Sequence, residues 1–482
     1  MTECVYFMGI GGIGMSALAR WFQAEGTTVA GYDRTKSPLT SALEGEGMTI
    51  DYTGDPEALP PTLKEDLAHR RTDRWTVVWT PAIPADFPLL VALQEAGFTL
   101  HKRAAILGKI SKGRPLLAVA GTHGKTTTST LLAHLLTHAG CEVDAFLGGI
   151  ALGASSNLIA TPVKGGKRWM VAEADEFDRS FLHLHPHHAV ITSVDPDHLD
   201  IYGSHDRMLD AFLAFASQVS TDGLLVHANI LSAWQTGSPL SDIGHSVYGA
   251  LPPGETPDQR GWDAGYSEVS DQEGSAGFTL HLPGCTPMRI HWNMPGENNA
   301  ANATAAAFLA GRAGVSTDHI VTGLASFSGI ARRFEIKHRT EHRVLVDDYA
   351  HHPTEIAGTI AAARLAFPGK KITGVFQPHL FSRTRDFLVE FAHALDALDE
   401  CILLPIYPAR EKPIPGVDAQ RIGEKITGCE VKCPAENRFL DVLKELDPEI
   451  LLFMGAGDLD RWIGPAWETL EQSHTPPQKN VP

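Results

Sequence analysis

LLAVAGTHGKTTT, residues 116–128, is the stretch that decides the fold. The run from Leu116 to Ala120 is apolar throughout, which predicts a buried strand, and residues 126–136 have the pattern of a helix. A glycine turn between such a strand and helix directs backbone N–H groups toward one point, and the helix N-terminus adds partial positive charge. The stretch therefore predicts a phosphate-binding loop.

Two side chains of this loop have roles that follow from nucleotide chemistry. Lys125 is expected to reach the β- and γ-phosphates of ATP, and the Thr126 hydroxyl to bind Mg²⁺. The spacing between the two glycines is shorter than in the usual loop, but a plain glycine turn would leave Lys125 without a role. The residues expected to bind ATP here are Gly121, Thr122, His123, Gly124, Lys125, Thr126 and Thr127.

Composition limits the kind of protein. A chain of 482 residues is too long for one core and suggests about three domains. The net charge of -17 argues against nucleic acid or an anionic membrane as a partner. The six cysteines are scattered without a C-x-x-C pair, as expected for reduced thiols, and no apolar run is long enough to span a bilayer. A cytoplasmic protein without a membrane anchor is expected.

The N-terminal region is expected to form one domain over residues 1–112. An expected strand at 5–8 leads into GIGGIG at 9–14 and then a helix, and a second expected strand at 28–31 is followed by Asp33. This is the fingerprint of a dinucleotide-binding, Rossmann-like unit. Such a turn binds a pyrophosphate, so NAD and a UDP-sugar are alternative ligands. The expected ligand-binding residues are Gly9, Gly11, Gly12, Gly14 and Asp33.

The middle region, residues 113–329, is expected to form a mostly parallel sheet of the phosphate-loop ATPase kind. Expected strands at 169–172 and 189–194 are followed by EADEFD and DPDHLD. Carboxylates at the ends of parallel strands can hold a metal beside phosphates. Thr126 and His198, which is flanked by carboxylates, are therefore the candidate metal ligands. Zinc is an alternative because of His183, His185, His187 and His188, but their alternation suits a strand edge better.

Two further segments of this region have distinct compositions. Residues 251–277 are rich in Pro, Gly, Asp and Ser and are expected to be a long surface excursion. Asn299 and Asn302 are three apart in an alanine-rich helix and share one face. Capping explains Asn299, whereas Asn302 inside the helix favours contact with a nucleotide or a metal-bound phosphate.

The C-terminal region, residues 330–482, is expected to form a second Rossmann-like sheet. Expected strands at 344–347, 372–376, 401–405 and 450–454 alternate with helices that include 354–367 and 384–398. Polar residues again follow the strands, as DDYAHHP from Asp347 and QPHLFSRTR from Gln377.

The sequence predicts a pyrophosphate-binding turn, an ATP-binding loop and a third sheet with polar residues after its strands. This combination suits an enzyme that joins two substrates at the expense of ATP. A carboxylate is a poor electrophile until a phosphoryl group is transferred to it, and an amine can attack the resulting acyl phosphate. Positive charge must gather at that point. Lys125, Mg²⁺ and Arg333 are the expected sources.

The order of motifs resembles the ATP-dependent Mur ligases of peptidoglycan assembly over nearly the whole chain, except residues 251–277 and the tail. His123 and the opening GIGGIGM are similar to the branch that adds L-alanine to the lactyl carboxylate of UDP-N-acetylmuramate. The motifs that carry the resemblance are GIGGIGMSALA, AGTHGKTTT, EADEFDRSFLHL, DHLD, NNAAN, ARRFE, VDDYAHHPTEI, FQPH and RTRDF.

The resemblance implies roles for individual residues. Lys125, Glu173, His198, Arg333 and Asp348 would be catalytic, with Thr126 and Glu173 on one Mg²⁺ and His198 on a second. Residues 9–14 would hold the UDP moiety. Asn299, Asn302, Arg333 and Asp348 would serve ATP, and Tyr349, His351, His379 and Arg383 would surround the amino acid.

Two departures from the family pattern bear on these roles. Residues 201–220 contain no lysine that could become the carbamate found in other branches, which agrees with the alanine-adding branch. Leu380 stands where some alanine-adding enzymes have arginine, so Arg383 is expected to bind more of the amino-acid carboxylate.

Three other functions account for parts of the sequence. A recycling ligase would attach a ready-made tripeptide to the same UDP-sugar. Its opening turn typically has a cysteine and a threonine where this chain has Gly11 to Ile13. A non-catalytic UDP-sugar sensor would not need Lys125, Glu173 and His198 together. An NAD dehydrogenase leaves the second and third regions unexplained.

Overall fold

The computed structural model describes residues 3–234, 239–270, 276–292, 294–409 and 411–474. It contains two units, each described by itself. The first runs to Ser267 and includes Thr279–Ile290 and Ala301–Ser328; the second consists of Glu268–Phe278, His291–Ala300 and the chain from Gly329. None of the described helices has the length and apolarity needed to cross a bilayer.

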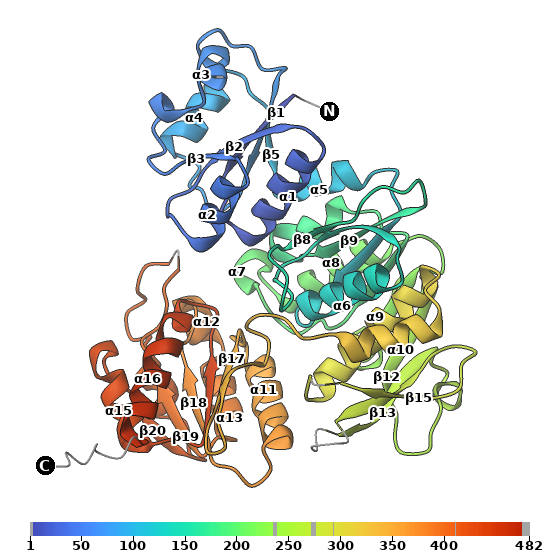
Figure 1. Cartoon of the computed structure of the whole chain (residues 1–482), viewed down its shortest axis with the longest axis vertical. Helices are drawn as coiled ribbons and strands as arrows, with labels where there is room; N and C mark the ends of the chain where they lie inside the picture. The colour runs from blue at the N-terminus through green and yellow to red at the C-terminus, as the bar shows by residue number, and fades with distance from the viewer. Residues whose placement is uncertain (1–2, 235–238, 271–275, 293, 410, 475–482) are drawn as a thin grey trace, which may run out of the picture. The chain divides into compact units, whose positions relative to one another are not determined.

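The N-terminal sheet has five parallel strands in the order β3-β2-β1-β4-β5 (Figure 1). Val5 and Phe7 of β1 (Cys4–Met8) pack with helix α1 (Ile13–Ala24), whereas Tyr6 and Met8 pack with the opposite layer. Both faces are covered, as parallel strands require, and the glycine turn lies where the strand order reverses. The other elements are β2 (Thr28–Tyr32), α2 (Pro38–Gly45), β3 (Thr49–Asp51), α3 (Pro61–Ala68), β4 (Trp75–Trp79), α4 (Pro88–Glu95), β5 (Leu100–Lys102) and α5 (Arg103–Ser111).

Strand β6 (Leu116–Ala120) lies inside a ten-stranded sheet of order β15-β14-β13-β12-β11-β10-β6-β9-β7-β8. Every residue of β6 is buried, and its neighbours β9 and β10 run parallel to it. The strands are β7 (Glu142–Phe146), β8 (Leu158–Ala160), β9 (Arg168–Ala174), β10 (His188–Ile191), β11 (Leu224–His227), β12 (His245–Ala250), β13 (Ala264–Ser270), β14 (Gly277–His281) and β15 (Met288–His291). The helices are α6 (Lys125–His138), α7 (Leu199–Tyr202), α8 (His205–Ala216), α9 (Glu297–Arg312) and α10 (Thr317–Ser326).

The C-terminal sheet has the order β16-β17-β21-β18-β19-β20, with β16 antiparallel to its neighbour. Val344 and Val346 of β17 pack with α11 and α13, and Leu345 packs with α15 and α16, so both faces are again covered. The elements are β16 (Glu335–Arg339), β17 (Val344–Asp348), α11 (Pro353–Ala366), β18 (Ile372–Phe376), α12 (Phe381–Asp386), α13 (Leu388–Leu395), β19 (Glu400–Leu403), α14 (Ala419–Gly423), β20 (Glu430–Lys432), α15 (Phe439–Leu446), β21 (Ile450–Met454) and α16 (Ile463–His474).

The mixed α/β fold with three largely parallel sheets is confirmed, but five local expectations are wrong. Strand β9 continues through Glu173 because that residue still pairs with β6, and β10 ends at Ile191. Residues 251–277 are not only a surface excursion, since β13 adds to the sheet there and buries Tyr266. The expected helix at 384–398 is two helices separated by Phe387, whose backbone is not helical. The alternating histidines do not form the expected strand edge, because residues 184–187 lie outside any strand.

Candidate active site

The phosphate loop forms as the sequence predicts, and α6 begins at Lys125. Gly121 (φ 131°) and Gly124 (φ 81°) adopt left-handed backbone angles that other residues rarely reach. The Ser193 hydroxyl accepts a hydrogen bond from the His123 N–H at 2.8 Å. These contacts fix the loop at the carboxyl end of β6, beside the segment that follows β10.

Asn302 of α9 lies directly against this loop. A Cβ atom added at Gly124 would overlap Oδ1 of Asn302, and the same Oδ1 accepts a hydrogen bond from the Thr128 hydroxyl at 3.2 Å. Asn302 is thus buried beside the start of α6. Asn299 is engaged locally, because its side-chain amide donates to the Pro295 carbonyl at 2.7 Å.

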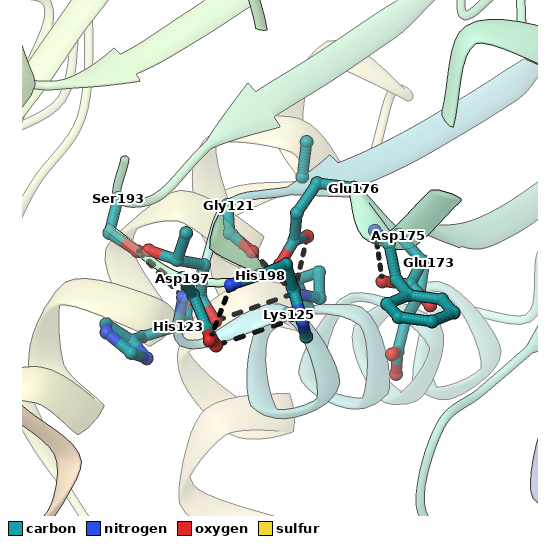
Figure 2. Close-up of polar contacts among 12 residues, drawn as sticks. Gly121, His123, Lys125, Glu173, Asp175, Glu176, Ser193, Asp197 and His198 are labelled. Carbon is teal, nitrogen blue, oxygen red and sulfur yellow. Dashed lines mark hydrogen bonds and ion pairs between the residues drawn. The ribbon is translucent and has the colours of Figure 1, made fainter. Parts of the chain in front are cut away.

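Lys125 is paired with Glu176, a residue that the sequence analysis did not single out. Its ammonium lies 2.7 Å and 3.0 Å from the two Glu176 carboxylate oxygens and donates to the Gly121 carbonyl at 2.7 Å. Figure 2 shows the two side chains pointing toward one another. Burial by itself would lower the pKa of Lys125, but the carboxylates of Glu176 and Asp175 raise it above its ordinary value. Lys125 therefore stays charged.

Glu173 contacts the first turns of α6, where a metal beside phosphates is expected. Its Oε2 accepts from the Thr126 hydroxyl at 3.3 Å, and its Oε1 accepts from the Ser129 hydroxyl at 3.1 Å and from the Gly148 N–H at 2.6 Å. A hydroxyl and a carboxylate next to a phosphate loop fit Mg²⁺, which takes few protein ligands and completes its shell with phosphate oxygens and water. Within the described residues, no group of three His, Cys, Asp or Glu side chains could hold a metal unaided.

His198 lies on the other side of Glu176. Its Nε2 is 3.7 Å from Glu176 Oε1 and 3.7 Å from Asp197 Oδ2 (Figure 2). Its ring packs edge-on against Phe177. His198 has a left-handed backbone (φ 51°), which is uncommon for a residue other than glycine and sets the ring at the start of α7. Glu176 is thus the link between Lys125 and His198.

The other residues predicted for the phosphate loop contact the segment after β10 or lie within α6. His123 Nε2 lies 3.2 Å from Asp195 Oδ2, and Thr122 Oγ1 lies 3.0 Å from the Ser193 hydroxyl. Thr127 is buried within α6. The sequence analysis missed Ser193 because nothing in its local pattern shows that the segment after β10 closes on the loop.

In the N-terminal sheet, Asp33 holds the glycine turn. Its Oδ2 accepts a hydrogen bond from the Gly11 N–H at 2.8 Å, and its Oδ1 accepts from the Thr35 N–H at 3.2 Å. Gly9 has a left-handed backbone (φ 85°) as the chain leaves β1. Asp33 therefore has a structural role in addition to the ligand-binding role that the sequence predicts.

Asp348 organises the predicted site of the second unit. Its two oxygens accept hydrogen bonds from the Phe334 and Ala350 N–H groups, both at 2.7 Å, which ties the turn carrying Arg333 to the end of β17. Burial raises the pKa of Asp348, and the charge of Arg333 opposes that shift.

Three of the residues predicted for the amino acid form one aromatic row. The ring centroids of Tyr349 and His351 are 5.3 Å apart, those of His351 and His379 are 6.1 Å apart, and Arg333 lies 5.3 Å from the Tyr349 ring. The His351 Nδ1 contacts the Tyr349 carbonyl at 2.9 Å.

Arg383 of α12 does not lie on the exposed side of its helix. Only 7% of its surface is exposed, whereas the neighbouring Arg385 is exposed and donates to Asp386 at 2.7 Å. Leu380, which precedes the helix, is buried and has φ 73°, a strained angle for leucine.

A buried strand, a glycine loop with a charged lysine and an adjacent carboxylate–hydroxyl pair define a nucleoside triphosphate-binding protein of the phosphate-loop class. Three family models match the chain: "Mur ligase family, catalytic domain" at residues 4–115, "Mur ligase middle domain" at 119–310, and "Mur ligase, glutamate ligase domain" at 332–457. The chain belongs to the Mur ligase family.

Similar proteins cover nearly the whole chain. It is 42% identical to UDP-N-acetylmuramate–L-alanine ligase of Cytophaga hutchinsonii, over 98% of this chain and 97% of the relative. It is 43% identical to the protein of that name from Porphyromonas gingivalis, over 97% and 99%. The crystal structure of UDP-N-acetylmuramate–alanine ligase from Thermotoga maritima matches with a TM-score of 0.76 and 25% identity, over 97% of this chain and 99% of that one.

Proposed function

We propose that this protein ligates L-alanine to the lactyl carboxylate of UDP-N-acetylmuramate, with conversion of ATP to ADP and phosphate, as a cytoplasmic step of peptidoglycan precursor synthesis. The observation that carries the proposal is the identity of 42% and 43%, over nearly full length, to relatives that bear the name of this activity. The intact phosphate loop with its charged Lys125 supports it independently.

The chemistry assigns the first step to the middle sheet. The lactyl carboxylate attacks the γ-phosphorus of ATP, the bond to the β-phosphate oxygen breaks, and ADP leaves. Lys125 faces the transferring phosphoryl group and offsets the charge that develops on it. Asn302, against the loop, and Thr126 and Thr127, in the first turn of α6, are proposed to complete the ATP site.

Mg²⁺ would be held by Thr126 and Glu173, with His198 on a second ion, and would supply Lewis-acid polarisation of the phosphate oxygens when bound. The contact between Thr126 and Glu173 supports the first assignment. Glu176 contacts both Lys125 and His198 and so holds the two side chains near one another.

In the second step, the amine of L-alanine attacks the acyl phosphate, the C–O bond to phosphate breaks, and the amine loses a proton. We assign residues 1–112 to the UDP-sugar, 113–329 to ATP and 330–482 to the amino acid. Arg333 and Asp348 would serve the nucleotide, and Tyr349, His351, His379 and buried Arg383 would surround L-alanine.

Product identification tests the proposal. The protein is incubated with ATP, Mg²⁺, UDP-N-acetylmuramate and either L-alanine or the tripeptide L-alanyl-γ-D-glutamyl-meso-diaminopimelate, and the nucleotide products are resolved by mass. Consumption of L-alanine, with phosphate release only when both co-substrates are present, is expected. Consumption of the tripeptide would favour the recycling ligase, and full-rate ATP hydrolysis without the UDP-sugar would overturn the acyl-phosphate route.

A titration separates the two ligands that the glycine turn at residues 9–14 could read. UDP-N-acetylmuramate is expected to bind and NAD to bind far more weakly. Tighter binding of NAD would refute the assignment of this turn. Binding of the UDP-sugar without any turnover under all conditions would instead favour a non-catalytic sensor.

A further inference from the structure

Arg103, the first residue of α5, lies against the last glycine of the N-terminal turn. A Cβ atom added at Gly14 would be 2.8 Å from Nη1 of Arg103 and 3.1 Å from its Cδ and Cζ atoms. Gly14 has an ordinary backbone angle, so space for the guanidinium, and not backbone conformation, explains the glycine here. The structure thus puts a cation beside the first turn of α1, whose N–H groups already favour an anion.

The other side of the Arg103 guanidinium faces Asp175, in the acidic segment after β9. The Nη2 to Oδ2 distance is 3.9 Å, and the two side chains are 26% and 36% exposed. A long, partly exposed ion pair of this kind contributes little to stability. A bound anion with better geometry can therefore take the guanidinium from Asp175.

Arg103 is not needed to hold α5 near the acidic segment, because its neighbour does so. Lys102 bonds to Asp178 at 2.5 Å. At Gly108, farther along α5, a Cβ atom would overlap the His183 carbonyl, so the helix backbone packs closely there. The Arg103 side chain is therefore available for another role, and Lys102 is its matched control.

We propose that Arg103 binds the diphosphate of the UDP-sugar and that Asp175 holds the guanidinium in place while the site is empty. The inference rests on the proposed function, because it assumes that a UDP-sugar occupies the turn at residues 9–14. A planar guanidinium can bind two phosphate oxygens at once, and a diphosphate offers such oxygens. Asp175 is a competitor of the ligand in this arrangement.

The test is calorimetric titration of UDP-N-acetylmuramate, UDP and uridine into the protein without ATP. Arg103→Gln should weaken binding of both diphosphates by about tenfold or more and leave uridine unchanged, since a charged hydrogen bond is worth roughly 1.5–3 kcal/mol. Asp175→Asn should tighten both diphosphates a few-fold, and this gain should vanish in the Arg103→Gln background. Lys102→Gln should have little effect on either.

The outcomes separate the inference from the proposed function. If the wild-type protein binds no UDP-sugar, the proposed function fails. If it binds the UDP-sugar but Arg103→Gln binds the two diphosphates as tightly, the inference is wrong and the proposed function stands. Equal weakening of diphosphates and uridine would show that Arg103 only shapes the turn, and would also overturn the inference. Circular dichroism of each variant verifies that it is folded.

Discussion

Replacing Lys125 by alanine should damage both turnover and stability, for separate reasons. The side chains of Lys125 and Glu176 are 16% and 1% exposed, and their charged atoms are 2.7 Å apart. Removing the lysine leaves the Glu176 carboxylate buried without its cation, which costs about 3–5 kcal/mol for a buried ion pair. In a domain of about 200 residues, each 1 kcal/mol lowers the melting temperature by roughly 2–4 °C, so a fall of about 6 °C or more is expected.

The second variant removes the stranded charge. Glu176→Gln in the Lys125→Ala background keeps the size of the side chain and eliminates the buried carboxylate, so most of the lost melting temperature should return. Turnover should not return. The charge that we propose to face the transferring phosphoryl group is still missing, and its loss is expected to cost about a hundredfold or more in kcat.

Differential scanning calorimetry and a phosphate-release assay on the four proteins of this cycle give both quantities. A double variant as unstable as Lys125→Ala would show that the ion pair is not the source of the instability. Turnover within a few-fold of the wild type in either alanine variant would refute the phosphate-loop assignment of Lys125.

Three further predictions use other features of the structure. Gly124→Ala should abolish ATP binding, measured by calorimetry, because a Cβ atom there overlaps the buried Asn302 side chain. Gly140→Ala, at a similar φ but with open space around it, should cost only backbone strain. Equal ATP affinity in the two variants would refute this prediction. Arg383→Lys should raise the KM for L-alanine strongly and the KM for ATP only slightly. Arg385→Lys, which changes an exposed ion pair, should alter neither KM value. Equal changes in both KM values of Arg383→Lys would show that another residue binds the carboxylate of L-alanine. Burial raises the pKa of Asp347 from 3.8 to about 6, so the folded protein holds a proton that the unfolded chain has released, and stability falls as pH rises through that window. Asp347→Asn should remove this fall in melting temperature, and an unchanged pH profile would contradict the assignment.

Local pattern was enough to predict the strands that carry the site. Leu116–Ala120 and Ile450–Met454 are short apolar runs bounded by turn residues, and both form as expected. Strand β13 was missed because its polar composition resembles a loop, and its pairing with β12 is a tertiary effect. The break between α12 and α13 at Phe387 is likewise not visible in the spacing of the apolar residues.

Side-chain partners were harder to predict than positions. Glu176 was visible as one member of an acidic run, but nothing in the run says which carboxylate faces Lys125. Arg103 had no signal at all, since its contact with Gly14 joins residues far apart in the sequence. The double role of Asp33, which bonds to the turn that it follows, also depends on the folded register.

Glu176 gives the phosphate loop an anion of its own. Because it belongs to the same chain and is held 2.7 Å from Lys125, this carboxylate acts as an intramolecular competitor. A single inorganic phosphate or sulfate ion must displace it for one new contact with Lys125. A triphosphate gains contacts along the whole loop and the first turn of α6, so the site selects ligands by the number of contacts they make and not by negative charge alone.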